Sequence, residues 1–275
     1  MEVYLDEFAL NDATNLMYLD ENIEGVAGLP NIRTSSGNNT GRDGAWVSRQ
    51  LYEGRFMSFK GRIFGGDNLQ VELKRQELAS ILRRKKLTLT IVTYGGQRFV
   101  TQVNVMANQM PITWQQNIVQ WKIDLLSEDP LFYDNSAGEL IAMLGKTKEG
   151  GFDIPFNIPL DISAGTPPTT VNNAGNETVY PIIKIETKAT NPQLINRSTN
   201  AFMGVEIAML DGDVLEIDMK NKTVTNNGLN IYGLQMAGSS FWGLGAGDNI
   251  LELITDINSE ATVAEIQYQS GFIGI

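Results

Sequence analysis

The sequence predicts a mainly β protein of two domains, with one helix in the first domain. Short apolar runs alternate along most of the 275 residues with turns rich in Gly, Asn and Asp. Only one segment shows clear helical spacing, and the composition shifts to small residues and glycines between residues 133 and 151. Many short strands with turns of this kind are typical of a sandwich or a barrel. We expect the domain boundary where the composition shifts.

The first domain opens with a strand candidate at residues 3–10 and reaches a polar, glycine-rich loop at residues 34–44. We expect this loop to be exposed and mobile, because it offers little that a core would bury. The stretch at residues 41–65 then places aromatic and apolar residues between spaced glycines. That pattern predicts strands with tight corners.

One helix is predicted at residues 69–84. Its apolar residues recur near the helical period, at Leu73, Leu78, Ile81 and Leu82. A basic run at residues 83–86 follows, and cations at the C-terminal end of a helix are stabilised by its dipole. Because the whole chain is acidic, we interpret this run as a solvated helix terminus and not as a nucleic-acid patch.

After the helix, strands are predicted at residues 87–93, 98–106 and 118–126, with a hairpin corner at Gly95-Gly96. The second domain should be almost wholly β, with strands at residues 182–186, 201–209, 213–219, 222–225, 229–233, 239–243, 249–254 and 262–269. Its hairpin turns are indicated by Asp211-Gly212, Asn221 and Asn227-Gly228.

Alternation is clearest at residues 214–219, where apolar and acidic side chains take turns. Successive side chains of a strand point to opposite faces of the sheet. One face should therefore be buried and formed by Leu215, Ile217 and Met219.

The composition excludes several functional classes, because the chain contains no histidine and no cysteine. Ser-His-Asp and Cys-His catalytic sites, the usual zinc sites and disulfides are all excluded. No catalytic, cofactor-binding or metal-binding residue is predicted, and the chain is not expected to be an enzyme. The net charge of -11 argues against tight nucleic-acid binding. We expect no membrane span and no signal peptide, and hence assembly in a cytoplasm.

The densest group of acidic residues is Asp211, Asp213, Glu216 and Asp218. A glycoside hydrolase needs only two carboxylates placed on either side of a sugar bond. The first two aspartates flank a turn glycine, however, and the other two acids alternate on a solvent face, which favours a soluble hairpin over catalysis. The spacing does not match a helix-loop-helix calcium site, so no metal is predicted.

Five aromatic residues are candidates for a sugar- or base-binding platform: Trp46, Trp114, Trp121, Phe241 and Trp242. Aromatic residues in strands more often belong to the core. Strand alternation turns one of Phe241 and Trp242 inward, which leaves at most one at the surface. The glycines that follow, Gly243, Gly245 and Gly247, do not form a phosphate loop because no lysine comes after them.

Seven segments, taken in their order, carry a likeness to a known family. The N-terminal half contains GRDGAWVSRQLYEGRFMSFKGRIFG, RQELASILRR and EDPLFYD, and the C-terminal half contains NNAGNETVYPIIKIE, NPQLINRSTN, GDVLEIDMKNKTV and SSFWGLGAGDNIL. They resemble the distal tail proteins of long-tailed phages of Gram-positive bacteria. The likeness extends over most of the chain and rests on the order of the segments more than on any one of them.

This resemblance implies an N-terminal split β-barrel with one helix at residues 1–134, a linker at 135–150 and a galectin-like β-sandwich docking domain at 151–275. It also implies a hexameric ring in the virion tail, joining the tail tube to the baseplate. The implied partners are further copies of the chain, the major tail tube protein, a tail-associated lysin or tail fibre hub, the tape measure and receptor-binding proteins. Galectin sugar sites use a histidine, so a sandwich without one is expected to dock proteins.

Two other functions stay open on the residues alone: a carbohydrate-binding adhesin module that uses the tryptophans, and a carboxylate-pair glycosidase that uses Asp213. A tail ring would instead surround a DNA channel, and a lysine-rich wall would hold the DNA by counterion release. We therefore expect an acidic or neutral wall, with the basic run 83–86 facing away from it. The acidic candidates for the wall are Asp6, Glu7, Asp12, Asp20, Glu21, Glu24 and Glu53.

Overall fold

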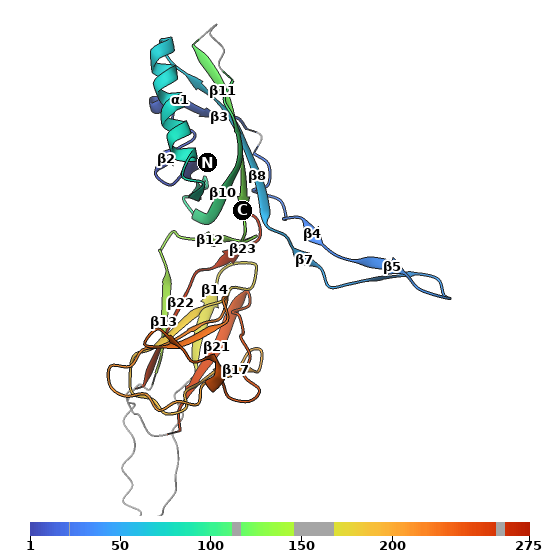
Figure 1. Cartoon of the computed structure of the whole chain (residues 1–275), viewed down its shortest axis with the longest axis vertical. Coiled ribbons are helices and arrows are strands. Elements are labelled where there is room, and N and C mark those ends of the chain that lie inside the picture. The colour runs from blue at the N-terminus through green and yellow to red at the C-terminus, as the bar shows by residue number, and fades with distance from the viewer. Residues whose placement is uncertain (22, 112–116, 146–167, 257–261) are drawn as a thin grey trace, which may run out of the picture. The chain divides into compact units, whose positions relative to one another are not determined.

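The computed structural model describes residues 1–21, 23–111, 117–145, 168–256 and 262–275. The chain divides into two compact units (Figure 1), and the first holds Met1–Ser136 together with the last residues, Phe272–Ile275. The second unit holds Ala137–Gly271. Strands dominate both units and the described residues contain one α-helix, which confirms the predicted mainly β fold.

Unit 1 is built on one antiparallel sheet with the strand order β2-β1-β9-β10-β11-β8-β3, and this sheet is barrel-like and nearly closed. Its strands are β1 (Glu2–Leu5), β2 (Phe8–Ala9), β3 (Met17–Leu19), β8 (Arg55–Phe64), β9 (Lys86–Val92), β10 (Arg98–Gln109) and β11 (Ile118–Ser127). Two short strands extend it, because β12 (Phe132–Asp134) pairs with β10 and with β23 (Gly271–Phe272).

The helix α1 (Asn68–Leu82) begins where Asp67 accepts a 2.8 Å hydrogen bond from the backbone N–H of Gln70. An acidic N-cap of this kind satisfies one of the free amides of the first turn. The helix buries Val71, Leu78 and Leu82 in the core of unit 1. Each of these side chains contributes roughly 2 kcal/mol by burial.

Leu73 was expected on the buried side of this helix, and that expectation is wrong, because its side chain is 58% exposed. It follows Val71 by two positions, and two positions turn a helix by about 200°. The basic run 83–86 also begins one residue after the helix ends. Within it, Arg84 forms a 3.1 Å ion pair with Asp6.

The sheet of unit 1 turns one face to the helix and the core. Along β11, Val119, Trp121 and Ile123 all lie on this buried face. Trp121 is paired in register with Gly61 of β8, and its indole occupies the space that a side chain at Gly61 would fill. The glycine is therefore required at this point, because the indole and the backbone of β3 approach it closely.

Unit 2 contains two antiparallel sheets and a core of its own. The six-stranded sheet has the order β13-β22-β15-β18-β19-β20, and the four-stranded sheet has the order β14-β21-β16-β17. The strands are β13 (Leu140–Gly145), β14 (Thr169–Asn173), β15 (Ile182–Ile185), β16 (Gln193–Asn196), β17 (Ala201–Gly204), β18 (Leu215–Asp218), β19 (Thr223–Asn226), β20 (Leu229–Asn230), β21 (Gly247–Ile254) and β22 (Val263–Tyr268). As predicted, Leu215, Ile217 and Met219 are buried.

Several predicted elements differ from the structure. Residues 3–10 form a hairpin of β1 and β2, because Asp6 adopts a left-handed φ of 54° that turns the chain back. Residues 239–243 lie in no named strand, and β17 stops at Gly204. Beyond Gly204, Val205 forms only an isolated bridge with Gln235 and the strand does not continue.

The predicted domain limits also differ in detail. Part of the expected linker, residues 140–145, is strand β13, paired along its length with β22. The last residues, Phe272–Ile275, were placed in the C-terminal domain but belong to unit 1. Residues 146–167 lie outside the described part of the chain. The galectin-like character of the C-terminal domain stays a prediction.

Candidate assembly interface

Residues 29–54 of unit 1 form a long two-stranded segment, which we call the arm. Figure 1 shows it extending away from the sheet. It consists of β4 (Ile32–Arg33) paired with β7 (Leu51–Tyr52) and, further out, β5 (Ser36–Asn38) paired with β6 (Ala45–Val47). Gly41 and Gly44 have φ values of 75° and 102°, which let the chain reverse at the tip.

The arm exposes large apolar side chains along its length. Trp46 is 50% exposed even though its indole lies over Gly37 on the opposite strand, and Val47 is 59% exposed. The other exposed apolar residues of the arm are Leu29, Ile32, Leu51 and Tyr52. The expectation that residues 34–44 are exposed is confirmed. A two-stranded hairpin is only marginally stable in water by itself, so these side chains mark the arm as an interface.

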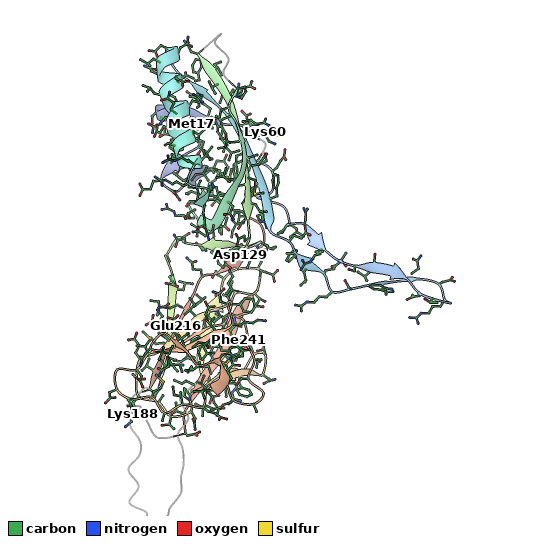
Figure 2. The ribbon with its side chains drawn as sticks, viewed as in Figure 1. Met17, Lys60, Asp129, Lys188, Glu216 and Phe241 are labelled. Carbon is green, nitrogen blue, oxygen red and sulfur yellow. The ribbon has the colours of Figure 1, made fainter. Side chains whose placement is uncertain are left out.

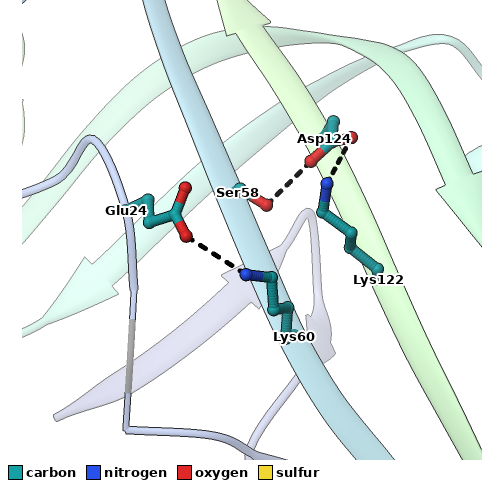
Figure 3. Close-up of polar contacts among 5 residues, drawn as sticks. All are labelled: Glu24, Ser58, Lys60, Lys122 and Asp124. Carbon is teal, nitrogen blue, oxygen red and sulfur yellow. Dashed lines mark hydrogen bonds and ion pairs between the residues drawn. The ribbon is translucent and has the colours of Figure 1, made fainter.

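A second candidate surface is the face of the unit 1 sheet that points away from α1. It carries three ion pairs, Lys60 with Glu24 at 3.1 Å, Arg62 with Asp20 at 3.4 Å and Lys122 with Asp124 at 3.1 Å. Figure 3 shows the first pair, which joins Lys60 of β8 to Glu24 on a neighbouring loop, and the third pair on β11. Each cation on this stretch of the two strands therefore has an acidic neighbour.

Asp124 is the most constrained carboxylate of this face. Its partial burial by itself would raise its pKa, but the hydroxyl of Ser58 donates a 2.7 Å hydrogen bond to it and Lys122 donates another at 3.1 Å. These donors stabilise the charged form and lower the pKa overall. The carboxylate thus stays ionised and balances the lysines around it.

The acidic group predicted in unit 2 stabilises turns. Asp213 accepts hydrogen bonds of 2.8 Å from the backbone N–H of Leu210 and from the side chain of Asn227, and both lower its pKa. Asp218 accepts from the backbone N–H of Asn221 at 2.8 Å. Glu216 (Figure 2) lies 3.7 Å from Lys184 across the sheet. A general acid needs a raised pKa, so this arrangement favours the structural interpretation.

The five aromatic candidates have different environments. Trp121 and Trp242 are buried, Trp46 lies on the arm, and Trp114 lies outside the described residues. Phe241 (Figure 2) is half-buried and stacks on exposed Tyr232, with ring centroids 6.2 Å apart. Sequence reasoning predicted that at most one of Phe241 and Trp242 reaches the surface, and this is confirmed.

One buried polar residue, Arg55, was missed by sequence reasoning. It starts β8, shares the buried face with Met57 and Phe59, and is 1% exposed. Strand alternation carries the signal that would have found it, because position 55 has the same parity as those two core residues. A charged residue on a buried face must meet specific partners.

No helix among the described residues is both long enough and apolar enough to cross a membrane. In the same residues, no set of three or more carboxylates converges in a way that would hold a metal ion.

Comparison with known proteins gives the family. Residues 174–272, which lie mostly in unit 2, match the C-terminal domain of siphovirus-type tail components. This part of the chain, about a third of its length, therefore carries the C-terminal domain of siphovirus-type tail components. This match supports the resemblance found in the sequence. The matched family and the similar solved structures are structural tail and baseplate proteins, not enzymes. No curated protein sequence matches it.

The chain shares its fold, over nearly its full length, with a solved structure. It is similar to the crystal structure of the Dit protein of phage SPP1, with a TM-score of 0.67 and 15% identity over 98% of both chains. That protein is described as a paradigm of the hub adsorption apparatus of phages that infect Gram-positive bacteria.

Two chains from baseplate structures of phage P2, in the activated conformation with Ca and with Sr, give TM-scores of 0.41 and 0.43 at 11% and 10% identity. The first match covers 89% of this chain and 91% of the other, and the second covers 98% and 91%. Neither likeness is close enough to support a shared fold.

Proposed function

We propose that six copies of this tail component form a ring at the tip of the phage tail, joining the tail tube to the baseplate or host-adsorption apparatus. The observation that carries the proposal is the arm, whose Trp46 and Val47 remain 50% and 59% exposed within the described residues of their own chain. A surface of this kind in a tail component is best explained by contact with a neighbouring copy.

The arm suits a closed ring for a geometric reason. Heterologous contacts, in which one surface meets a different surface of the next copy, generate rings when the rotation closes. An extended hairpin that leaves its own sheet supplies such a contact, because it pairs or packs on a neighbour and cannot pack on itself. Apolar side chains of the arm would be buried in the process.

The two units are proposed to divide the contacts with other tail proteins. The first unit would stack on the major tail tube protein and on a tail-associated lysin or tail fibre hub, with the tape measure passing through. The second, as a galectin-like domain, would hold receptor-binding proteins. Its chain lacks the histidine on which galectin sugar sites depend. Assembly of the ring would take place in the host cytoplasm.

The charge-paired sheet face is proposed to line the channel. Each of Lys60, Arg62 and Lys122 has an acidic neighbour, so this face offers few unpaired cations to DNA. Affinity for DNA comes from cations that displace counterions, and a neutral or acidic wall avoids it. Tight, salt-sensitive binding of duplex DNA by the purified ring, measured by fluorescence anisotropy, would contradict this role.

A carbohydrate-binding adhesin is the second candidate function, and the stacked Tyr232 and Phe241 favour it. Exposed aromatic rings offer an apolar face to sugars. Binding of cell-wall glycans by the wild-type chain that is lost in Tyr232→Ala would support this function. Glycan binding that stays undetectable would leave unit 2 as a protein-docking domain.

The mass of the purified chain in solution tests the ring. We expect the mass of a hexamer, alone or with the tail tube protein, and loss of that hexamer in the double variant Trp46→Ser with Val47→Ser. Tyr94→Ser is the matched control, because Tyr94 is 95% exposed on a hairpin of unit 1 outside the arm. A wild-type chain that stays monomeric even with the tube protein would overturn the proposal.

A further inference from the structure

One arginine ties together the two ends of the arm. Arg55 directly follows the arm, and its Nη1 donates hydrogen bonds to the carbonyl oxygens of Gly25 at 2.7 Å and Gly28 at 2.8 Å. Both carbonyls lie just before the arm begins. Gly25 itself has a φ of 81° and approaches the backbone of Phe56 so closely that no side chain would fit. The base of the arm is thus held at a fixed point of the sheet.

The same side chain holds the last residues of the protein. The Nη2 of Arg55 donates to the carbonyl of Ile273, and its Nε donates to the carbonyl of Pro130 at 2.9 Å. Its guanidinium carbon also lies 4.9 Å from the ring centroid of Phe132. One buried cation therefore joins the arm, the segment around β12 and the C-terminus.

Residues 272–275 also pack directly on the segment that precedes the arm. A side chain added at Gly274 would come within 2.9 Å of the carbonyl oxygen of Ala27. Phe272 meets Phe99 of β10 edge to face, with ring centroids 5.1 Å apart. The last four residues therefore complete the wall of unit 1 at the point from which the arm leaves.

Loss of residues 272–275 would therefore affect more of unit 1 than strand β23, because Arg55 would lose one of its hydrogen-bond acceptors. Arg55 is almost fully buried, and burial lowers its pKa. A buried cation needs all of its hydrogen-bond acceptors, because an N–H left without one loses its interaction with water as well. Removal of the Ile273 carbonyl would weaken the hold of Arg55 on Gly25 and Gly28.

We propose that residues 272–275 act as a clasp: their docking on Arg55 fixes the base of the arm and makes the chain competent to assemble. A chain in which these residues are not docked would carry an arm whose base is not held, so docking is expected to precede assembly with other copies. The assembly step of this proposal rests on the proposed role of the arm in the ring.

The test compares the full chain with a chain that ends at Gly271, using two readouts. The first is the rate of protease cleavage within residues 25–55 of the monomer at low concentration, which does not require a ring. The second is the mass at high concentration. We expect the truncated chain to be cleaved about ten-fold faster and to form no hexamer, since lost charge-assisted hydrogen bonds favour local opening. A peptide of residues 268–275, added in excess, should restore protection.

Two milder variants keep the test decisive if the truncated chain does not fold. Gly274→Val places a side chain against Ala27 while leaving Arg55 intact, and Arg55→Lys keeps the charge but loses the fork of donors. Both should speed cleavage in residues 25–55, whereas Arg62→Lys on the exposed face of β8 should not. Unchanged cleavage in both would overturn the clasp.

The two proposals fail in different ways. If the wild-type chain stays monomeric while Gly274→Val still speeds cleavage, the clasp stands and the ring is refuted. If truncated and full-length chains are cleaved at the same rate and form hexamers equally, the ring stands and the clasp is refuted.

Discussion

The arm and the β18–β19 hairpin of unit 2 use similar local chemistry and have opposite environments. Both are antiparallel pairs. In β18–β19 the paired residues Ile217 and Val224 are both buried, whereas in β5–β6 Trp46 faces solvent over Gly37. The sequence of two paired strands thus determines that a hairpin forms. It does not determine whether the same chain or another molecule buries the apolar side chains of that hairpin. The uncovered hairpin is the one that we propose to act between copies.

The two hairpins should differ most in their rates of proteolytic cleavage. We expect cleavage at residues 34–44 to be roughly 100-fold faster than within residues 214–226, because opening of an exposed hairpin costs little and opening of a buried one approaches the cost of global unfolding. A time course of limited digestion followed by mass spectrometry measures both rates. Cleavage scattered through residues 214–253, with no stable C-terminal fragment, would show that the two hairpins do not differ.

A charge on the buried face should have the largest effect on stability. Ile217→Asp places an unpaired carboxylate in the core of unit 2 and should cost roughly 3–5 kcal/mol in the free energy of unfolding. Glu216→Lys on the opposite face should cost about 1 kcal/mol or less, mainly through repulsion from Lys184. Denaturant titration of both variants gives these values. Equal shifts in the unfolding midpoint would refute the assigned faces.

Glycine substitutions sharpen the comparison, because a glycine that follows the β18–β19 hairpin and a glycine of the arm share a backbone conformation. Gly228 in the β19–β20 turn and Gly41 at the tip of the arm have φ values of 76° and 75°. Alanine is strained there by about 1 kcal/mol. Gly228→Ala should lower the free energy of unfolding by that amount, whereas Gly41→Ala in the monomer should leave it unchanged, because the arm opens independently of the core. Equal losses would show that the arm unfolds together with the sheet.

Titration of a turn carboxylate should give the smallest effect. Hydrogen bonds from Leu210 and Asn227 lower the pKa of Asp213 in the folded state, so its stabilising contribution is full above the unfolded pKa of about 4 and is lost as the pH falls through the folded value. The stability difference between wild type and Asp213→Asn should therefore shrink below about pH 4. A difference that does not vary with pH would contradict this assignment.

Local signals in the sequence predicted the parts of the fold that depend on near neighbours. The alternation around Ile217, the turn at Asn227-Gly228 and the helix ending near Leu82 all follow from period and turn chemistry, and the structure confirms them. Strand β13 was missed because its composition, LIAMLG, does not alternate between apolar and polar residues. Its pairing with β22 joins segments more than 100 residues apart, and no local pattern encodes such a pairing.

The candidate interface was harder to predict for the same reason. The segment around Trp46 has the apolar and aromatic character of a core strand, and only the structure shows that no sheet covers it. The burial of Arg55 could have been predicted, because strand alternation places position 55 of β8 on the same face as the core residues Met57 and Phe59. Its partners, from Gly25 to Ile273, are distant in sequence and could not be inferred from spacing.

The pairing of β12 with β23 bears on how such tail proteins diversify. The chain leaves unit 1 just after β12 and re-enters it through β23, so the whole of unit 2 is an insertion between two neighbouring strands. Insertions with adjacent ends leave the host fold intact and are readily tolerated. Exchange of the inserted domain would therefore leave the sheet and the arm of unit 1 intact.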